Sequence, residues 1–168
     1  MTETDPDERS PDELRAYVFR YEEHMPNTDD LSLTVLKGHL LIEEMLVKAI
    51  ERLLPNPGYL RSERLSFHQR VCLLRSAIRG KHDHDAWSLI EKLNTLRNAL
   101  VHNLDPPELR KKIDDVFASD ARTQPFDEVG INKTGEAVLD SNERLRLAIV
   151  TCIQFLYGVT CSIGRGAE

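Results

Sequence analysis

The chain alternates between amphipathic segments with helical periodicity and short polar breaks. In each segment apolar residues recur three or four positions apart, which is the repeat of one helix face. Proline and glycine, as in residues 55–58, mark the ends of such segments. The pattern predicts five to six helices, at 11–24, from caps at 27–30 to about 54, from Ser62 or Ser66 to about Gly80, from Asp83 or Asp85 to about 103, from 105 to about 119, and from Ser141 to about Gly164.

These helices predict one all-α domain, an up-and-down bundle joined by short loops. Residues 1–10 are acidic and polar, and we expect them to be a disordered tail, so that the domain comprises residues 11–164. Residues 120–139 are polar and irregular. Within them, residues 129–139 could form a small β-hairpin.

The composition is that of an ordinary globular protein. The 168 residues are 40% hydrophobic and 30% charged, enough for one core beneath a well-solvated surface. The chain has no run of eighteen apolar residues and no basic, apolar leader, so we expect neither a membrane span nor secretion. Cys72, Cys152 and Cys161 form no paired motif, and the first two lie in apolar helical runs. They predict reduced core cysteines and a cytoplasmic location.

The fourth predicted helix carries an arginine on its apolar side. A repeat of about 100° per residue places most of its leucines on one arc, and Arg97 falls inside that arc. A buried guanidinium is unfavourable unless it is paired and hydrogen-bonded. The other polar residues form a line on the opposite side of this helix, namely Glu91, Asn94, Asn98 and His102.

The second predicted helix offers a partner for this arginine. His39 and Glu43 interrupt its wide apolar surface and, being four apart, lie on one face. We therefore predict a contact between Arg97 and Glu43, with His39 nearby. Two plainer interpretations remain open: a purely structural ion pair, and Asn98 and His102 as ordinary surface or dimer-contact residues.

These residues also match a known pattern. The run Arg97-Asn98-x-x-x-His102, at the end of a helix and after a long helix bearing His39 and Glu43, resembles the HEPN superfamily. Its signature is an arginine, usually followed by a polar residue, with a histidine four to six positions on. The similarity covers roughly residues 28–104, and the segment at residues 65–71 looks most like the mannitol-repressor-like (MltR) branch.

The resemblance implies a helical fold and a specific chemistry. Catalytic HEPN proteins are metal-independent endoribonucleases that act as homodimers, often in toxin–antitoxin or phage-defence systems. It assigns Arg97, Asn98 and His102 as catalytic, with Glu43 and His39 supporting them. An imidazole suits proton transfer to and from the ribose 2′-hydroxyl and the leaving oxygen, and a guanidinium suits the phosphate. The products would be a 2′,3′-cyclic phosphate and a 5′-hydroxyl.

Two alternatives to a nuclease remain open. The MltR-like branch includes regulators without shown nuclease activity, so the chain could be a non-catalytic HEPN-fold regulator or interaction module. It could also be an unrelated helical scaffold. No nucleotidyltransferase signature is present, so an antitoxin partner would be a separate protein.

The net charge and the distribution of basic residues limit where RNA could bind on the chain. The net charge of −6 argues against a broad nucleic-acid surface. Residues 61–81 nevertheless carry six basic residues against one acid, and these are RNA-binding candidates: Arg61, Arg64, Arg70, Arg75, Arg79 and Lys81. A solvated helix face is the plainer interpretation. His82 and His84 have no third ligand at a suitable spacing, and glycine-rich phosphate loops are absent, so neither a metal nor a cofactor is predicted.

Overall fold

The computed structural model describes residues 10–61, 64–80, 83–119 and 140–163. These residues form seven helices, which confirms the all-α bundle: α1 Ser10–His24, α2 Leu31–Leu53, α3 Gly58–Arg61, α4 Phe67–Ala77, α5 Ala86–His102, α6 Leu109–Phe117 and α7 Ser141–Ile163. Of the tail expected at residues 1–10, Ser10 is instead the first residue of α1, and residues 1–9 lie outside the described residues, as does the hairpin expected at 129–139.

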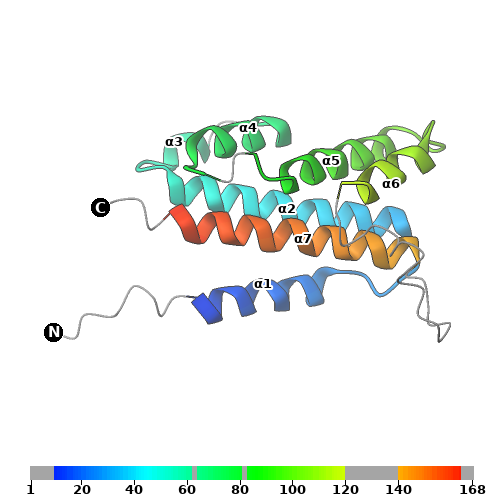
Figure 1. Cartoon of the computed structure of the whole chain (residues 1–168), viewed down its shortest axis with the longest axis horizontal. Helices are drawn as coiled ribbons and strands as arrows, with labels where there is room; N and C mark the ends of the chain where they lie inside the picture. Colours follow the sequence, from blue (N-terminus) through cyan, green and yellow to red (C-terminus); the bar gives the residue numbers. More distant parts are fainter. Residues whose placement is uncertain (1–9, 62–63, 81–82, 120–139, 164–168) are drawn as a thin grey trace.

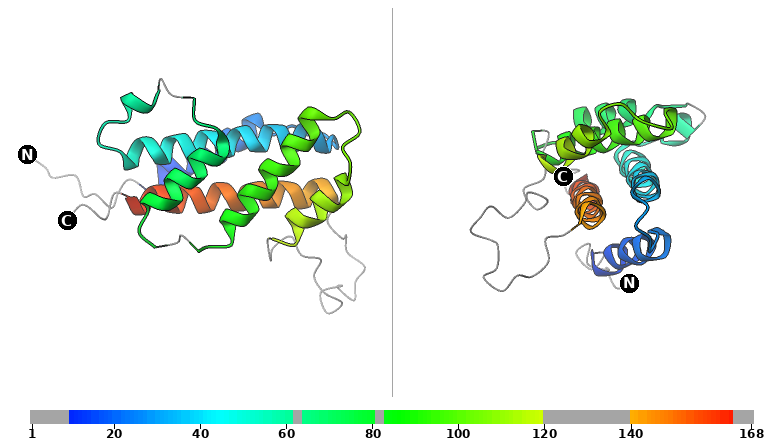
Figure 2. Two further views of the ribbon diagram at one scale, coloured as in Figure 1. Left: turned by 90° about the horizontal axis from the view of Figure 1, so that it is seen from above. Right: turned by 90° about the vertical axis from the view of Figure 1, so that its right-hand side faces the viewer.

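The helices form three layers (Figure 1). The long helices α2 and α7 lie side by side in the middle and run in the same direction, although they are far apart in the sequence. Helix α1 covers one face of this pair, and α4, α5 and α6 cover the other (Figure 2). Seen from above, α4 and α5 cross the central pair obliquely, so that each extends across both α2 and α7.

The α2–α7 pair holds most of the core. Ile42, Leu46, Leu145, Ile149 and Leu156 are all fully buried. Gly38 allows the two helices to approach closely, because a Cβ atom there would lie only 2.7 Å from Ile149 Cγ1. By length and composition α7 is the one described helix that could cross a membrane. An apolar helix packed along the centre of a bundle passes the same test.

Local signals explain where the helices begin. Asp30 caps α2 by accepting a hydrogen bond from the Leu33 amide. Ser66, rather than Ser62, caps α4 and forms a capping box with Gln69. Helix α6 begins later than the expected residue 105, because Glu108 has a positive φ of 55°, a conformation that an α-helix does not accommodate.

The cysteine prediction is half right. Cys152 is buried in α7, and none of the three cysteines is in a disulfide. Cys72, however, is exposed, and its Sγ lies 3.4 Å from His68 Nε2. Helix α4 lies at the edge of the bundle and buries only Phe67, Val71 and Leu74, so the side that carries Cys72 faces solvent.

Candidate functional site

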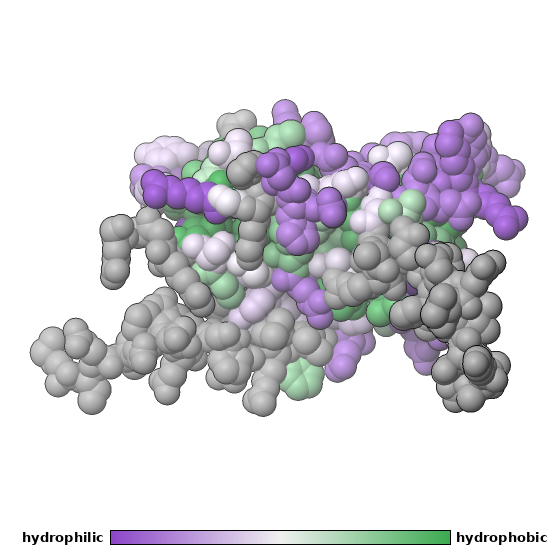
Figure 3. Space-filling view, in the orientation of Figure 1, coloured by the Kyte–Doolittle hydropathy of each residue, from purple (hydrophilic) through white to green (hydrophobic). Residues whose placement is uncertain are grey.

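The motif predicted to be catalytic occupies the last two turns of α5. His102 is the final residue of this helix and is exposed, whereas Arg97 and Asn98 are half-buried. The Asn103 side chain closes the helix end by donating a hydrogen bond to the Ala99 carbonyl at 3.3 Å. Strongly hydrophilic side chains gather over the end of the molecule where α5 ends and α6 begins (Figure 3). The motif therefore lies at an open, polar end of the bundle.

A side-chain hydrogen bond joins the first two motif residues. Arg97 Nη1 donates to Asn98 Oδ1 at 3.0 Å. Consecutive helical residues point about 100° apart, so this bond directs the guanidinium toward the side of α5 that carries Asn98. Asn98 and His102 are four residues apart and share that side. Asn98 thus connects the cation to the face that carries the imidazole.

The arginine and the histidine do not share a face by themselves. Five residues of helix separate them by about 140° around the axis. Arg97 leaves α5 on the side that packs toward α2, while His102 leaves it toward solvent. Within a single copy of the chain, the Arg97 guanidinium is therefore linked to the face that carries His102 only through its hydrogen bond to Asn98.

Glu43 does not pair with Arg97, and that prediction was wrong. Its Oε1 instead accepts a charged hydrogen bond from Arg70 Nη1 of α4. Both α4 and α5 pack against α2, and the rotation of α4 places Arg70 over this carboxylate. The pair is partly buried, with side-chain exposures of 21% for Arg70 and 32% for Glu43.

His39 lies deeper between the same helices, in a seam that it forms with Phe67 of α4 and Asn94 of α5. It is 4% exposed, its Nε2 lies 3.0 Å from Asn94 Oδ1, and its ring stacks at 4.3 Å on Phe67. With Nε2 donating to this acceptor, Nδ1 is buried without a partner. Burial is the largest effect and lowers the pKa of His39 overall. The hydrogen bond to Asn94 acts to raise this pKa, the positive charge of Arg97 acts to lower it, and the charge of Glu43 acts to raise it. His39 is therefore neutral at neutral pH.

This environment places the supporting residues close to the motif. The charges of both Arg97 and Glu43 act on the His39 ring, so each of these two groups lies within electrostatic range of that ring. Their hydrogen-bond partners differ from the Arg97–Glu43 contact that the sequence predicted. Glu43 bonds to α4 and His39 bonds to α5, whereas Arg97 bonds to its own neighbour.

Sequence reasoning missed two residues of this seam. Asn94 had been placed with the outward polar line, but it points inward to His39. Its position three residues before Arg97 and four after the buried Ile90, at the edge of the apolar arc, was the available signal. The second is Phe67, because nothing in the sequence indicated that its ring stacks on His39.

The four basic candidates whose side chains are described, Arg64, Arg70, Arg75 and Arg79, do not form one surface. Arg70 points to Glu43, on the α2 side of α4. Arg75 lies about 140° around α4 from Arg70, and Arg79 lies beyond the end of this helix. Arg64 and Arg79 are exposed, and Arg75 is half-buried. The side chains of Arg61 and Lys81 lie outside the described residues.

Comparison of the chain with protein-family models, with curated proteins and with solved structures gave no match. The functional interpretation therefore depends on the geometry of this site and on the motif itself. In the described part of the chain no three His, Cys, Asp or Glu side chains are grouped so that they could hold a metal ion. The chemistry available to the site is that of an imidazole, a guanidinium and an amide.

Proposed function

We propose that this chain is a HEPN-type endoribonuclease that acts as a homodimer in the cytoplasm, as part of a toxin–antitoxin or phage-defence system. The observation that carries the proposal is the Arg97–Asn98 hydrogen bond of 3.0 Å beside an exposed His102 on the same face as Asn98. The bond orients a permanent cation toward the side from which a solvent-accessible imidazole projects. These are the two groups that metal-free RNA cleavage requires.

The reaction needs no group beyond these side chains and the RNA. His102 of one copy removes the proton from the ribose 2′-hydroxyl, whose oxygen attacks the adjacent phosphorus. Arg97 stabilises the negative charge on the non-bridging oxygens of the transition state. A protonated His102 of the second copy gives its proton to the departing 5′-oxygen. The products are a 2′,3′-cyclic phosphate and a 5′-hydroxyl.

Two features support a dimer as the active form. Arg97 and His102 diverge by about 140° around α5, so a second copy would complete the pocket that one copy leaves open. In addition, Val101 lies within the motif and Leu104 lies two residues after it, and they are 46% and 102% exposed. Apolar side chains beside a polar site are typical of an association surface.

One observation favours a non-catalytic alternative. Among the described residues no side chain bonds to the His102 ring, so nothing within one copy fixes its orientation. A HEPN-fold regulator or interaction module of MltR-like type, bound to a separate protein, would need no such orientation. The two functions differ in whether RNA is cut.

A cleavage assay in the presence of a chelator distinguishes them. Wild-type protein should cut a mixed RNA pool to 2′,3′-cyclic phosphate ends, and His102→Ala should reduce the rate by about 100- to 10,000-fold. Asn98→Ala should reduce it by up to about 100-fold, because it frees the Arg97 guanidinium. His68→Ala, an exposed histidine on α4, is the matched control and should cut normally.

Expression in cells adds an independent readout. Wild-type protein should arrest growth, and His102→Ala should relieve the arrest. Sedimentation should give a dimer for both. Equal cleavage by the wild type and His102→Ala, or a strictly monomeric wild type, overturns the nuclease proposal. A dimer that binds a partner protein without cutting RNA supports the regulator.

A further inference from the structure

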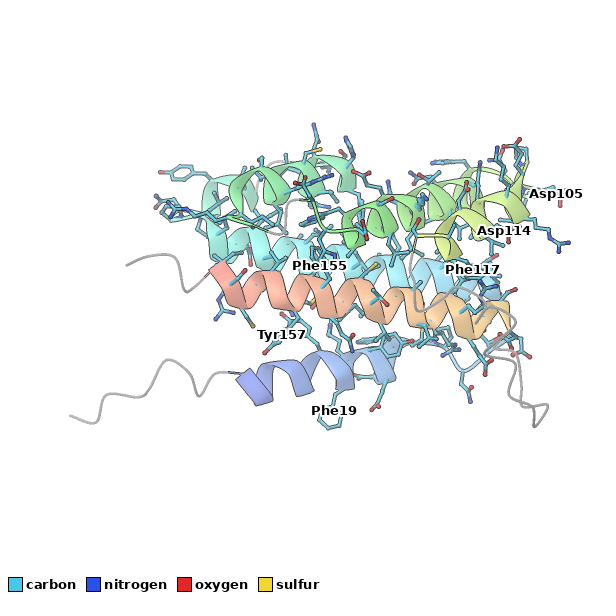
Figure 4. All side chains as sticks on the ribbon, viewed as in Figure 1. Phe19, Asp105, Asp114, Phe117, Phe155 and Tyr157 are labelled. Carbon is cyan, nitrogen blue, oxygen red and sulfur yellow. The ribbon has the colours of Figure 1, made fainter. Side chains whose placement is uncertain are left out.

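A buried histidine holds the helix that carries the motif against the centre of the bundle. His39 of α2 is 4% exposed, and its Nε2 lies 3.0 Å from Asn94 Oδ1 of α5. Asn94 lies one turn before Asn98 and two turns before His102. These turns lead to the open end of the molecule, where Figure 4 shows Asp105 pointing away from the helices. The position of the last turns of α5 therefore depends on the contact that the His39 ring makes.

The surroundings of His39 accommodate only a neutral ring. With Nε2 donating to Asn94, Nδ1 is buried and has no hydrogen-bond partner among the described residues. The ring also stacks at 4.3 Å on Phe67 of α4, which covers one of its faces. A second proton would turn Nδ1 into a buried N–H donor without an acceptor, and such a donor is more stable in water.

The charges around the ring do not compensate for a second proton. Burial is the largest effect and lowers the pKa of His39 overall, and the positive charge of Arg97 on α5 also acts to lower it. Glu43, on α2 itself, acts to raise this pKa, but its carboxylate already accepts a hydrogen bond from Arg70 of α4. Helix α7 meets the neighbouring residue of α2 with the apolar side chain of Ile149. The ring therefore gains a proton only in acid.

We propose that His39 is an acid-sensitive latch between α2 and α5, which opens when the ring gains a second proton and frees the turns that carry Asn98 and His102. The protonated ring leaves the seam because both of its N–H donors find acceptors in water. Its bond to Asn94 and its stacking on Phe67 are lost together, so α5 is no longer held against α2 at this point. As a control of RNA cleavage the latch rests on the proposed nuclease, but as a conformational change it does not.

Hydrogen exchange of the full chain measures the release of α5, at about pH 7.5 and 5.5 and corrected for the intrinsic effect of pH on exchange. Because the released ring has the usual pKa of about 6.5, opening of α5 in the wild type should increase by up to about tenfold between these conditions. His39→Gln keeps an amide donor for Asn94 and does not titrate, so its α5 should open equally at both. His68→Gln removes an exposed histidine of α4 and is the matched control, which should behave as the wild type does.

Low concentrations of urea distinguish a latch from unfolding of the whole bundle. Release of α5 alone exposes little surface, so its exchange should depend weakly on urea, whereas the amides of the central helix α7 should exchange more slowly and depend strongly on it. Equal protection and equal urea dependence of α5 and α7 would mean that the ring leaves only on global unfolding, and this overturns the proposal. An equal effect of pH on the wild type and His39→Gln also overturns it. Each variant is compared with itself at two pH values, so a less stable variant still reports.

Single-turnover cleavage of one RNA tests whether the latch controls the site. His39→Gln should keep a larger fraction of its neutral rate at about pH 5.5 than the wild type does, since the titration of His102 is common to both. Identical pH profiles of cleavage, with different exchange, overturn the role of the latch in regulation. If the wild type cuts no RNA, the nuclease proposal fails, and the exchange measurement still decides whether the latch exists.

Discussion

His39 Nε2 and Asn94 Oδ1 lie 3.0 Å apart, and this hydrogen bond joins α2 to α5 one turn before Arg97. The contact leaves the other ring nitrogen of His39 buried and without a partner. A neutral ring tolerates this arrangement. A protonated ring would carry an N–H donor with nothing to accept it, close to the positive charge of Arg97.

We therefore expect acid to destabilise the fold through His39. Its pKa in the folded chain is below the usual value of 6.5, so the unfolded chain takes up a proton first as the pH falls. The stabilisation is complete above about pH 6.5 and is lost as the pH falls from there toward the folded pKa. His39→Gln should reduce this loss, measured as the change in urea unfolding midpoint between about pH 7.5 and 5.5.

Exposed His68 on α4 provides the control for this measurement. His68→Gln should keep the acid dependence of the wild type. If the unfolding midpoints of His39→Gln and His68→Gln depend on pH to the same extent, His39 is not the cause of the acid destabilisation.

The ion pair between Arg70 and Glu43 predicts which arginine stabilises the fold. Arg70→Met should lower the free energy of unfolding by about 1–2 kcal/mol, between the values for exposed and fully buried pairs, since both side chains are partly exposed. Arg97→Met should cost less, because it leaves Glu43 paired. Chemical unfolding of both variants measures the difference.

A double-mutant cycle with Glu43→Gln tests this assignment directly. Coupling should appear between Arg70 and Glu43 and be near zero between Arg97 and Glu43. Larger coupling to Arg97 would mean that the carboxylate changes partner in solution.

The close approach of α2 and α7 makes Gly38 intolerant of any side chain. Its Cβ would lie 2.7 Å from Ile149 Cγ1 and closer still to Cδ1, inside van der Waals contact. Gly38→Ala should destabilise the chain by about 1–3 kcal/mol, as overpacking does in other cores. Gly58→Ala, where a Cβ meets nothing within 4 Å, should change stability by less than about 0.5 kcal/mol.

Ile149→Val removes the nearest atom and should recover part of the loss in the Gly38→Ala background. Thermal melting of the single and double variants gives the comparison. If the losses of stability from Gly38→Ala and Ile149→Val simply add in the double variant, a direct steric clash between the two side chains is contradicted.

The helices could be predicted from the sequence to within a residue or so at several ends. The predicted ends at residues 54, 103 and 164 compare with Leu53, His102 and Ile163 in α2, α5 and α7. Helix α3, with four residues, was missed because it is too short to show periodicity. The predicted motif residues Arg97 and Asn98 do lie beside each other, as any adjacent pair must, but their hydrogen bond could not be read from the sequence.

Helix positions, core faces and the Arg97-Asn98-x-x-x-His102 motif follow from the sequence alone, since periodicity and capping are local properties of consecutive residues. The pairing of Glu43 with Arg70, the inward turn of Asn94 to His39 and the exposure of Cys72 were decided by the tertiary structure. Each depends on how far one helix is rotated against another. That rotation is set by the packing of the whole core, so it has no signature in any single stretch of residues.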